Sequence, residues 1–331
     1  MTVPEKSRIA SIWLPFPAAD SWAGAGSLLR WLCRGDFVQR DLPEEPLDSL
    51  LRLLGRRAPA SGRAALRFYG QTGDKPRVWM AAADPVYLEP RLDHLFLHSL
   101  SAREFDAPSL RALFDHLHTT LASGSDADYA RVGGMGYLRS DEPFDTAGLS
   151  ASAVDQRVPN DWMPRGESAA AYRRQLSEIE MALHEHPVNA ERMQSGRFPV
   201  NSLWLWGGGT LPELHPEPLP PLFCNDPLLL GFWRLNDSRV AGWPGSIDGC
   251  LEAAAGSFAA QIPFAVEHVD ELQPALVTLR RALVERELDE VRLFFATGAE
   301  LSLRRGHRWR WWRRVERSAW AEAGGLHAAD S

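Results

Sequence analysis

The sequence predicts an α/β protein in which helices flank a mixed sheet, and two observations lead to this fold class. Short apolar segments typical of buried strands alternate along the chain with longer segments whose leucines recur every three or four residues, as on one face of a helix. Proline and glycine stand between these segments, where they end strands and helices. The 331 residues exceed the usual size of a single core, so one large domain and two domains sharing an interface are both open.

The first half of the chain alternates strands with helices. Four leucines share one helical face within residues 106–121. A proline cannot donate to a β-ladder, so we expect the apolar strand at residues 77–83 to end at Asp84 and Pro85. The elements expected in this half are strands at residues 8–14, 77–83, 86–99 and 129–138 and helices at residues 26–33, 48–54 and 106–121.

The second half begins with the clearest helix of the sequence, at residues 167–185, where four apolar side chains form one stripe and Pro187 ends the pattern. An apolar strand at 199–206 runs into three successive glycines that let the chain turn sharply, and the proline-rich residues 212–221 predict an extended surface segment. The remaining expected elements are strands at residues 222–224 and 261–266, helices at 226–233, 246–260 and 271–287, and a hairpin over 291–304 around Gly298.

A domain boundary is predicted within residues 140–164, which are polar and rich in turn residues, with Pro159, Asn160 and Asp161 as the linker. This gives an N-terminal α/β part at 1–160, a C-terminal α/β part at 161–320 packed on it, and a frayed tail at 321–331.

Composition narrows the class of protein. A net charge of -7 argues against a surface built as a whole to hold nucleic acid or anionic membrane. The three cysteines have no close spacing suited to a zinc site and cannot pair completely, which favours a reduced compartment. Because no apolar run reaches 18 residues, we expect a soluble, cytoplasmic protein.

Four segments carry a family resemblance. They are WMAAADPVYLEPRLDHLFL at 79–97, EIEMALHEHPVNAER at 178–192, NSLWLWGGG at 201–209 and FCNDPLLLGFW at 223–233. The chain resembles a proteobacterial family of cofactor-independent phosphoglycerate mutases that includes regulatory proteins of the Rpf type. The resemblance implies an alkaline-phosphatase-like fold and a phosphoryl transfer that uses a serine nucleophile beside two Mn²⁺ or Mg²⁺ ions held by aspartates and histidines.

This sequence departs from that catalytic pattern. The strand at 8–14 lacks the Asp-Gly that commonly follows it in the superfamily, and the nearest aspartate is Asp20. No Asp-Gly-Glu or Asp-His-Gly segment late in the chain completes a two-metal set. The leading hypothesis is therefore a mutase-like protein that is non-catalytic and serves as a regulatory or small-ligand-binding protein. A metal-dependent phosphomutase or phosphatase acting on a phosphorylated small molecule is the alternative.

The candidate metal ligands are Asp20, His184 and His186. Both histidines stand at the end of the helix at 167–185, where histidine also interacts favourably with the exposed carbonyls. Ser202 is the candidate nucleophile, although no adjacent base is evident in the sequence and a structural hydroxyl is the interpretation that the sequence favours.

The candidate ligand-binding residues are Asp84, Asn189, Arg192, Asn201, Gly207, Gly208 and Gly209. Arginine and asparagine can bind a carboxylate or phosphate through fixed donors, but a helix cap and a surface ion pair explain them as well. The three glycines can present backbone N–H groups to an anion, or they can allow a strained turn with close backbone packing. Asp84 ends a buried strand, where α/β proteins place ligand-binding groups, yet an Asp-Pro turn explains it equally.

A second alternative function is nucleic-acid binding by the segment at 304–317, which contains seven arginines with tryptophans between them. Arg308, Arg310, Arg313 and Arg314 would contact phosphates while the tryptophan rings stack on bases. Tryptophans that alternate with arginines are also typical of a core or a domain interface, where the arginines stack on the rings.

Overall fold

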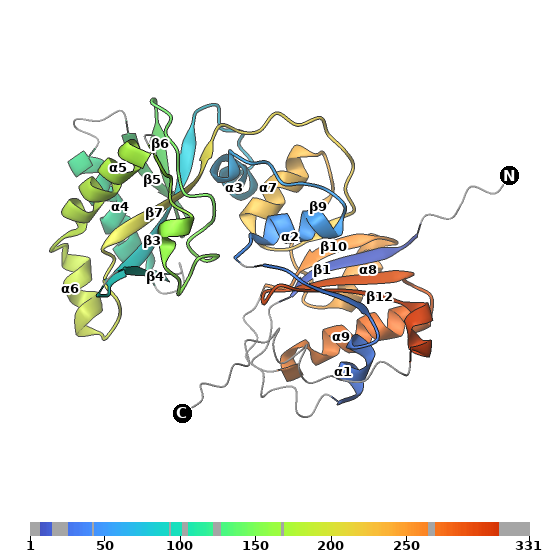
Figure 1. Ribbon diagram of the computed structural model, residues 1–331. Coiled ribbons are helices and arrows are strands. Elements are labelled where there is room, and N and C mark those ends of the chain that lie inside the picture. Colours follow the sequence, from blue (N-terminus) through green and yellow to red (C-terminus); the bar gives the residue numbers. More distant parts are fainter. Residues whose placement is uncertain are drawn as a thin grey trace, which may run out of the picture. The chain divides into compact units, whose positions relative to one another are not determined.

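The computed structural model describes residues 7–14, 26–41, 43–92, 94–100, 105–121, 127–166, 169–263 and 269–310. It contains a seven-stranded and a five-stranded sheet with helices packed against them, which confirms the predicted α/β class (Figure 1). The chain forms two compact units. One is Pro59–Leu214, and the other combines Met1–Ala58 with His215–Ser331.

The seven-stranded sheet belongs to the unit formed by both ends of the chain, and its strand order is β2-β12-β11-β1-β10-β8-β9. The pairs within β11-β1-β10-β8-β9 are parallel, whereas β12 and β2 are added in antiparallel orientation. The strands are β1 (Ile9–Leu14), β2 (Asp36–Gln39), β8 (Leu222–Phe223), β9 (Val240–Ala241), β10 (Phe258–Gln261), β11 (Glu290–Phe295) and β12 (Ala299–Arg304).

Helices cover this sheet. The main core packs α1 (Gly26–Leu32), α8 (Ile247–Ala254) and α9 (Val269–Val284) against alternate residues of the strands, such as Ala10 and Ile12 of β1. The residues between them, Ser11 and Trp13, belong to the other face of the strand because side chains alternate along β-structure. Helix α2 (Pro46–Leu53) contacts β1 and β11, and α7 (Pro227–Leu235) contacts α2.

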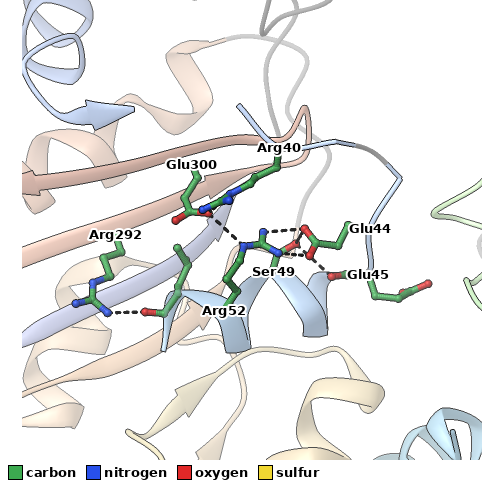
Figure 2. A network of polar contacts seen from close by, with 8 residues as sticks. Arg40, Glu44, Glu45, Ser49, Arg52, Arg292 and Glu300 are labelled. Carbon is green, nitrogen blue, oxygen red and sulfur yellow. Dashed lines mark hydrogen bonds and ion pairs between the residues drawn. The ribbon is translucent and has the colours of Figure 1, made fainter. Parts of the chain in front are cut away.

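A network of ion pairs ties α2 to the sheet (Figure 2). Arg52 of α2 donates to Glu44 and, from Nε at 3.2 Å, to Glu300 of β12, while its guanidinium lies 5.3 Å from the ring centre of Phe294. Arg40 donates to the same Glu300 oxygen at 2.8 Å. Burial works to raise the pKa of Glu300, but hydrogen bonds from Arg40 and Arg52 outweigh it and lower this pKa below its usual value.

The five-stranded sheet is built around the long strand β3 within Pro59–Leu214. One edge of β3 pairs with β7, and the other pairs first with β6 and then with β4, while β5 completes a hairpin with β6. Its strands are β3 (Met80–Pro90), β4 (Leu95–Ser99), β5 (Ala127–Val132), β6 (Met135–Ser140) and β7 (Ser202–Gly209).

Four α-helices accompany this sheet: α3 (Arg63–Thr72), α4 (Ala107–Leu121), α5 (Ala169–Leu183) and α6 (Pro187–Gln194). Helix α3 packs on β3 and β7, and α4 packs beside α5. The stripe predicted within 167–185 is buried as expected, with Tyr172 and Ile179 fully enclosed. Pro187 does end α5, and it also serves as the first residue of α6, where its missing N–H leaves no hydrogen bond unmade.

The strand predicted to end at Asp84 instead continues to Pro90, so this prediction was wrong. Pro85 pairs with Leu203 of β7, and its carbonyl accepts from the Leu100 backbone at 3.1 Å. The carbonyl and the absent N–H of one residue point to the same side of a strand, and on that side the neighbour of β3 changes from β6 to β4. The proline therefore removes no bond from a continuous ladder.

The structure also divides the chain differently from the predicted boundary at residue 160. Strands from before and after this point, β3 and β7, are hydrogen-bonded in one sheet, so the boundary falls inside a compact unit. Residues 159–161 form a short 3-10 helix, η3 (Pro159–Asp161), and Ala147 bridges Trp206 of β7. The polar composition of 140–164 reflects an ordered loop, and the tail at 321–331 lies outside the described residues.

Two further elements differ from expectation. The helix predicted over 246–260 ends at Ala254, because Ala255 and Gly256 take positive φ values of 50° and 158°, and the chain then enters β10. Gly207–Gly209 are the last residues of β7 rather than a turn beyond it. The pairing with β3 is irregular there, and Gly207 and Gly209 have φ values of 64° and 145°.

Candidate functional site

Asp84, predicted as a ligand-binding residue, is engaged at both carboxylate oxygens. Oδ1 accepts from Arg67 of α3 at 2.7 Å, and Oδ2 accepts from the indole N–H of Trp206 at 2.6 Å. Arg67 also donates to the carbonyl of Gly136 at 2.6 Å. The carboxylate is thus a connector between α3, β3 and β7.

Two aromatic rings enclose the arginine of this pair. The Arg67 guanidinium lies 4.7 Å from the ring centre of Tyr137 and 5.3 Å from that of Trp206. Burial works to lower the pKa of Arg67, but the charge of Asp84 and the contact with Tyr137 outweigh it, so this pKa is raised. Stacking and a hydrogen-bonded carboxylate are the conditions under which a buried arginine remains charged.

Asn189 and Asn201 hold backbone together. The Asn189 side chain donates to the carbonyls of Leu183 and Val200 and accepts from the Val200 N–H at 2.8 Å. Asn201 accepts from the N–H of Leu88 at 2.8 Å and donates to its carbonyl at 2.9 Å. Both amides thereby fix the entry into β7, since each bridges backbone groups far apart in the sequence.

Arg192 and Ser202 are also interior residues. Arg192 is 3% exposed, donates from Nε to the carbonyl of Phe198 at 2.7 Å, and stacks 4.3 Å from the ring centre of Phe105. Ser202 is fully buried beside Glu180 of α5. Burial raises the pKa of Glu180, and the Ser202 hydroxyl offsets only part of this increase. A nucleophile must reach its substrate, and the position of Ser202 encloses it.

The two histidines lie in different surroundings. His184 is 80% exposed, whereas His186 is 9% exposed, accepts from the Val188 N–H at 3.3 Å as the N-cap of α6, and lies against the ring of His116. Asp20 lies outside the described residues. Within the described ranges, no three side chains of His, Cys, Asp or Glu are grouped so that they could hold a metal ion. The residues described do not supply the metal set of the resemblance.

An open cleft of about 600 Å³ in the Pro59–Leu214 unit is lined in part by the predicted glycines. We call it the aromatic cleft, because Trp79, Phe144 and Trp162 form its walls. Trp79 and Phe144 pack with ring centres 4.9 Å apart. Its other lining residues are Ala60, Ser61, Pro143, Asp145, Thr146, Ala147, Gly148, Met163, Pro164, Arg165, Gly207, Gly208 and Gly209.

The glycines form one wall of this cleft through close backbone packing. Gly207 N–H donates to the Ala147 carbonyl at 3.0 Å, and Gly208 N–H donates to Thr146 Oγ1 at 2.8 Å. A Cβ on Gly208 would lie 2.8 Å from Trp79, and one on Gly209 would lie 2.5 Å from the nitrogen of Gly62. Because these N–H groups are already bonded within the chain, the contacts of Gly207 and Gly208 support the packing interpretation, and ligand binding by the glycines stays a prediction.

Sequence reasoning missed the aromatic cleft because it assigned residues 140–164 to a linker. The available signal was the presence of Phe144 and Trp162 within a polar stretch, since large aromatic side chains are rare in exposed linkers.

The carboxyl edge of the parallel strands is the second place where this fold can hold a ligand. β1, β8, β10 and β11 all end at this edge, where open α/β sheets bind their ligands. Asp226 follows β8 and caps α7 by accepting from the Leu228 N–H at 2.8 Å. Thr297 follows β11, and its buried hydroxyl has no hydrogen-bond partner in the described part of the chain.

The predicted nucleic-acid segment is described only to residue 310. Arg308 lies 4.8 Å from the ring centre of Trp309, and Arg310 donates to the carboxylate of Asp36 at 2.5 Å. Trp309 is 65% exposed. Arg313 and Arg314 lie outside the described residues.

Three relatives of this chain are named as phosphoglycerate mutases. No known family model matches it. A 2,3-bisphosphoglycerate-independent phosphoglycerate mutase of Methanosarcina mazei is 35% identical over 144 residues, which is 40% of this chain and 34% of that protein. A probable enzyme of the same name from Geobacter sulfurreducens is 25% identical over 138 residues, 39% of this chain and 33% of its own length. Another from Methanosarcina acetivorans is 37% identical over 54 residues, 16% of this chain and 14% of that protein.

The matched segments thus span about a third or less of these relatives. Two solved structures are also similar to this chain. A cofactor-independent phosphoglycerate mutase from Thermoplasma acidophilum has 18% identity and a TM-score of 0.41, with 89% of both chains covered. The PH0037 protein from Pyrococcus horikoshii has 12% identity and a TM-score of 0.48, with 90% of this chain and 88% of that one covered.

These relatives confirm the likeness to cofactor-independent phosphoglycerate mutases that the sequence segments indicated. The connection to a proteobacterial family and to Rpf-type regulatory proteins stays a prediction. No helix of the described residues is long and apolar enough to cross a membrane.

Proposed function

We propose that this phosphoglycerate-mutase-like protein is non-catalytic and binds a small ligand, in a regulatory role, at the aromatic cleft. The observation that carries the proposal is the engagement of Asp84, whose two carboxylate oxygens are occupied by Arg67 and Trp206. Ser202 is enclosed, and His184 and His186 do not share a site. Of the polar groups predicted for catalysis, Asp84 and His186 are thus hydrogen-bonded within the fold and Ser202 is enclosed by it.

The cleft itself suits recognition of a compact molecule with a flat apolar part. Its volume of about 600 Å³ lies within the range of small-molecule sites, and three aromatic side chains can contact a planar group. Asp145 and Arg165 supply polar groups among the lining residues. The backbone wall at Gly208 leaves no room for a side chain, so its shape is set by the glycine.

The binding experiment uses the dye 1-anilinonaphthalene-8-sulfonate, whose fused rings match the walls of the cleft. We expect saturable binding at one site, monitored by dye fluorescence, that Trp162→Ala weakens by about tenfold, because an aromatic side chain is removed from the wall. Gly208→Ala should also weaken binding, since its methyl group would displace Trp79 or Thr146. Gly306→Ala is the matched control, because Gly306 does not line the cleft and its added Cβ meets no atom within 4 Å.

The catalytic experiment incubates the purified protein with 3-phosphoglycerate and Mn²⁺. We expect no turnover above the rate without protein. Turnover that is lost on Asp20→Asn, together with bound metal found by elemental analysis of the same preparation, would overturn the non-catalytic proposal.

A working phosphomutase or phosphatase is the second candidate, and the carboxyl edge of the seven-stranded sheet favours it. In sequence, Asp20 follows β1 and His268 follows β10, and Asp226 follows β8. The relatives named as mutases add to this candidate. The turnover experiment decides between the two, because the first candidate requires an inactive protein and the second requires an active one.

A further inference from the structure

A strongly basic cavity of about 330 Å³ lies in the other unit, between α1, α9 and the 3-10 helix η4 (Arg305–Trp309) that follows β12. Figure 1 shows α1 and α9 side by side under the seven-stranded sheet. We call this cavity the arginine pocket. The arginines that line it are Arg30, Arg34, Arg280, Arg304, Arg305 and Arg308.

Most of these arginines have no carboxylate partner among the residues that the structure describes. Arg304 pairs with Glu290 at 3.2 Å, and Arg34 donates to the carbonyl of Arg308 at 3.0 Å. No carboxylate of the described ranges pairs with the other four, and none lines the pocket. The protein as a whole carries a net charge of -7, so this local excess of positive charge is not a consequence of composition.

Neighbouring arginines repel Arg305 in the pocket. The Arg305 side chain reaches solvent, but its Nε is buried and has no acceptor in the described part of the chain. Repulsion from Arg286, together with burial and the charge of Arg308, lowers the pKa of Arg305. Folding has brought these positive charges together. A bound anion would offset the repulsion between them and accept a hydrogen bond from the Arg305 Nε.

We propose that the arginine pocket binds a small molecule that carries a phosphate or diphosphate group. Guanidinium groups donate paired hydrogen bonds that match the spacing of phosphate oxygens, and four unpaired ones surround one cavity. The indole of Trp31 lies in the same wall and offers an apolar surface to the remainder of the molecule.

The size and setting of the pocket favour a small molecule over nucleic acid. Its volume is near the lower end of small-molecule sites, and three elements surround it. A long polyanion would extend across a protein of net negative charge, which repels it outside the pocket.

The pocket does not coincide with the edge where α/β sheets hold their substrates. Arg304 ends β12 and pairs with Glu290, the first residue of β11, so the pocket lies toward the amino end of that strand. β1, β8, β10 and β11 end at the opposite edge. The anion site is therefore separate from a catalytic site at the carboxyl edge, and it lies in a different unit from the aromatic cleft.

The test is calorimetric titration of the full chain with inorganic pyrophosphate at low ionic strength. The variant Arg280→Gln/Arg308→Gln removes two exposed side chains that pair with no carboxylate in the described ranges, so it should fold normally. We expect it to lower affinity by about a hundredfold, roughly tenfold for each guanidinium removed. The matched control is Arg281→Gln, the neighbour of Arg280, which is held by Asp248, Glu285 and Glu287 and should keep the affinity unchanged.

Three results would overturn the proposal. The first is no binding of pyrophosphate to the wild-type protein. The second is an equal loss of affinity in Arg281→Gln, which would indicate a diffuse charge effect. The third is binding of a single-stranded DNA oligonucleotide, lost in the double variant, without binding of pyrophosphate, which would assign the pocket to nucleic acid. Because the titration measures pyrophosphate alone, its outcome is independent of binding at the aromatic cleft.

Discussion

On the α2 side of the seven-stranded sheet, each arginine labelled in Figure 2 pairs with a carboxylate, whereas the arginine pocket holds four that pair with no carboxylate of the described residues. Arg52 lies between Glu44 and Glu300, and Arg292 pairs with Glu290 at 3.0 Å and also donates to the backbone of Leu53. The paired arginines connect helices to strands. Among the unpaired ones, Arg305 and Arg308 repel each other in the folded state, so a bound anion explains their grouping better than stability does.

In the Pro59–Leu214 unit, Arg67 pairs with Asp84 and is more buried than the paired arginines of Figure 2. The side chain of Arg67 is 7% exposed and that of Asp84 is 21% exposed, and two rings and a carbonyl complete their surroundings. The comparison therefore predicts a graded effect of losing an arginine, which follows the burial of the arginine itself, since the side chain of Arg52 is 31% exposed.

The largest expected effect is that of Arg67→Met. The substitution leaves the Asp84 carboxylate partly buried without its cation, which should cost about 3–5 kcal/mol in the free energy of unfolding measured with urea. Arg67→Met/Asp84→Asn is the control, because it removes the charge while its amide oxygen still accepts from Trp206. It should recover a good part of the loss. Equal destabilisation by the single and double variants would show that packing, rather than charge pairing, dominates.

A smaller loss of unfolding free energy is expected when the pH is lowered. Hydrogen bonds from Arg40 and Arg52 outweigh burial and lower the pKa of Glu300 in the folded protein from the ordinary 4.5, so Glu300 stabilises the fold above that pH. This stability is lost as pH falls through the folded pKa, because protonation breaks the pairs. The free energy of unfolding should therefore fall more steeply in the wild type than in Glu300→Gln between about pH 5 and pH 3. Parallel curves for the two proteins would contradict the role of the network.

The main elements could be predicted from the sequence wherever burial repeats at a regular period. The stripe of α5 and the hairpin of β11 and β12 lie where the pattern places them, since both follow from local periodicity. The path of β3 through Pro85 could not be predicted, because it depends on the change of partner strand from β6 to β4, which is a property of the assembled sheet.

The candidate sites were less predictable for a related reason. Asp84 and Asn189 have the same sequence appearance whether they bind a ligand or hold backbone groups. The partner Arg67 lies 17 residues from Asp84, and the partner Val200 lies 11 residues from Asn189. The arginines of the pocket are more than 240 positions apart between α1 and α9, so no window of sequence contains them together. Only the part of the cluster near Arg308 was visible as a run of charge, and it pointed to nucleic acid.

The smallest expected effect on stability belongs to the arginine pocket. Arg280→Gln/Arg308→Gln should leave the free energy of unfolding within about 0.5 kcal/mol of the wild type, or raise it slightly at low ionic strength, because it removes repulsion with Arg305. Arg52→Gln on the other side of the sheet removes one charge fewer, yet it should cost about 1–2 kcal/mol because Glu44 and Glu300 lose a shared partner. Urea unfolding without phosphate in the buffer measures both. If the double variant costs as much as Arg52→Gln, the pocket arginines hold the fold, and a phosphate is no longer needed to explain why they lie together.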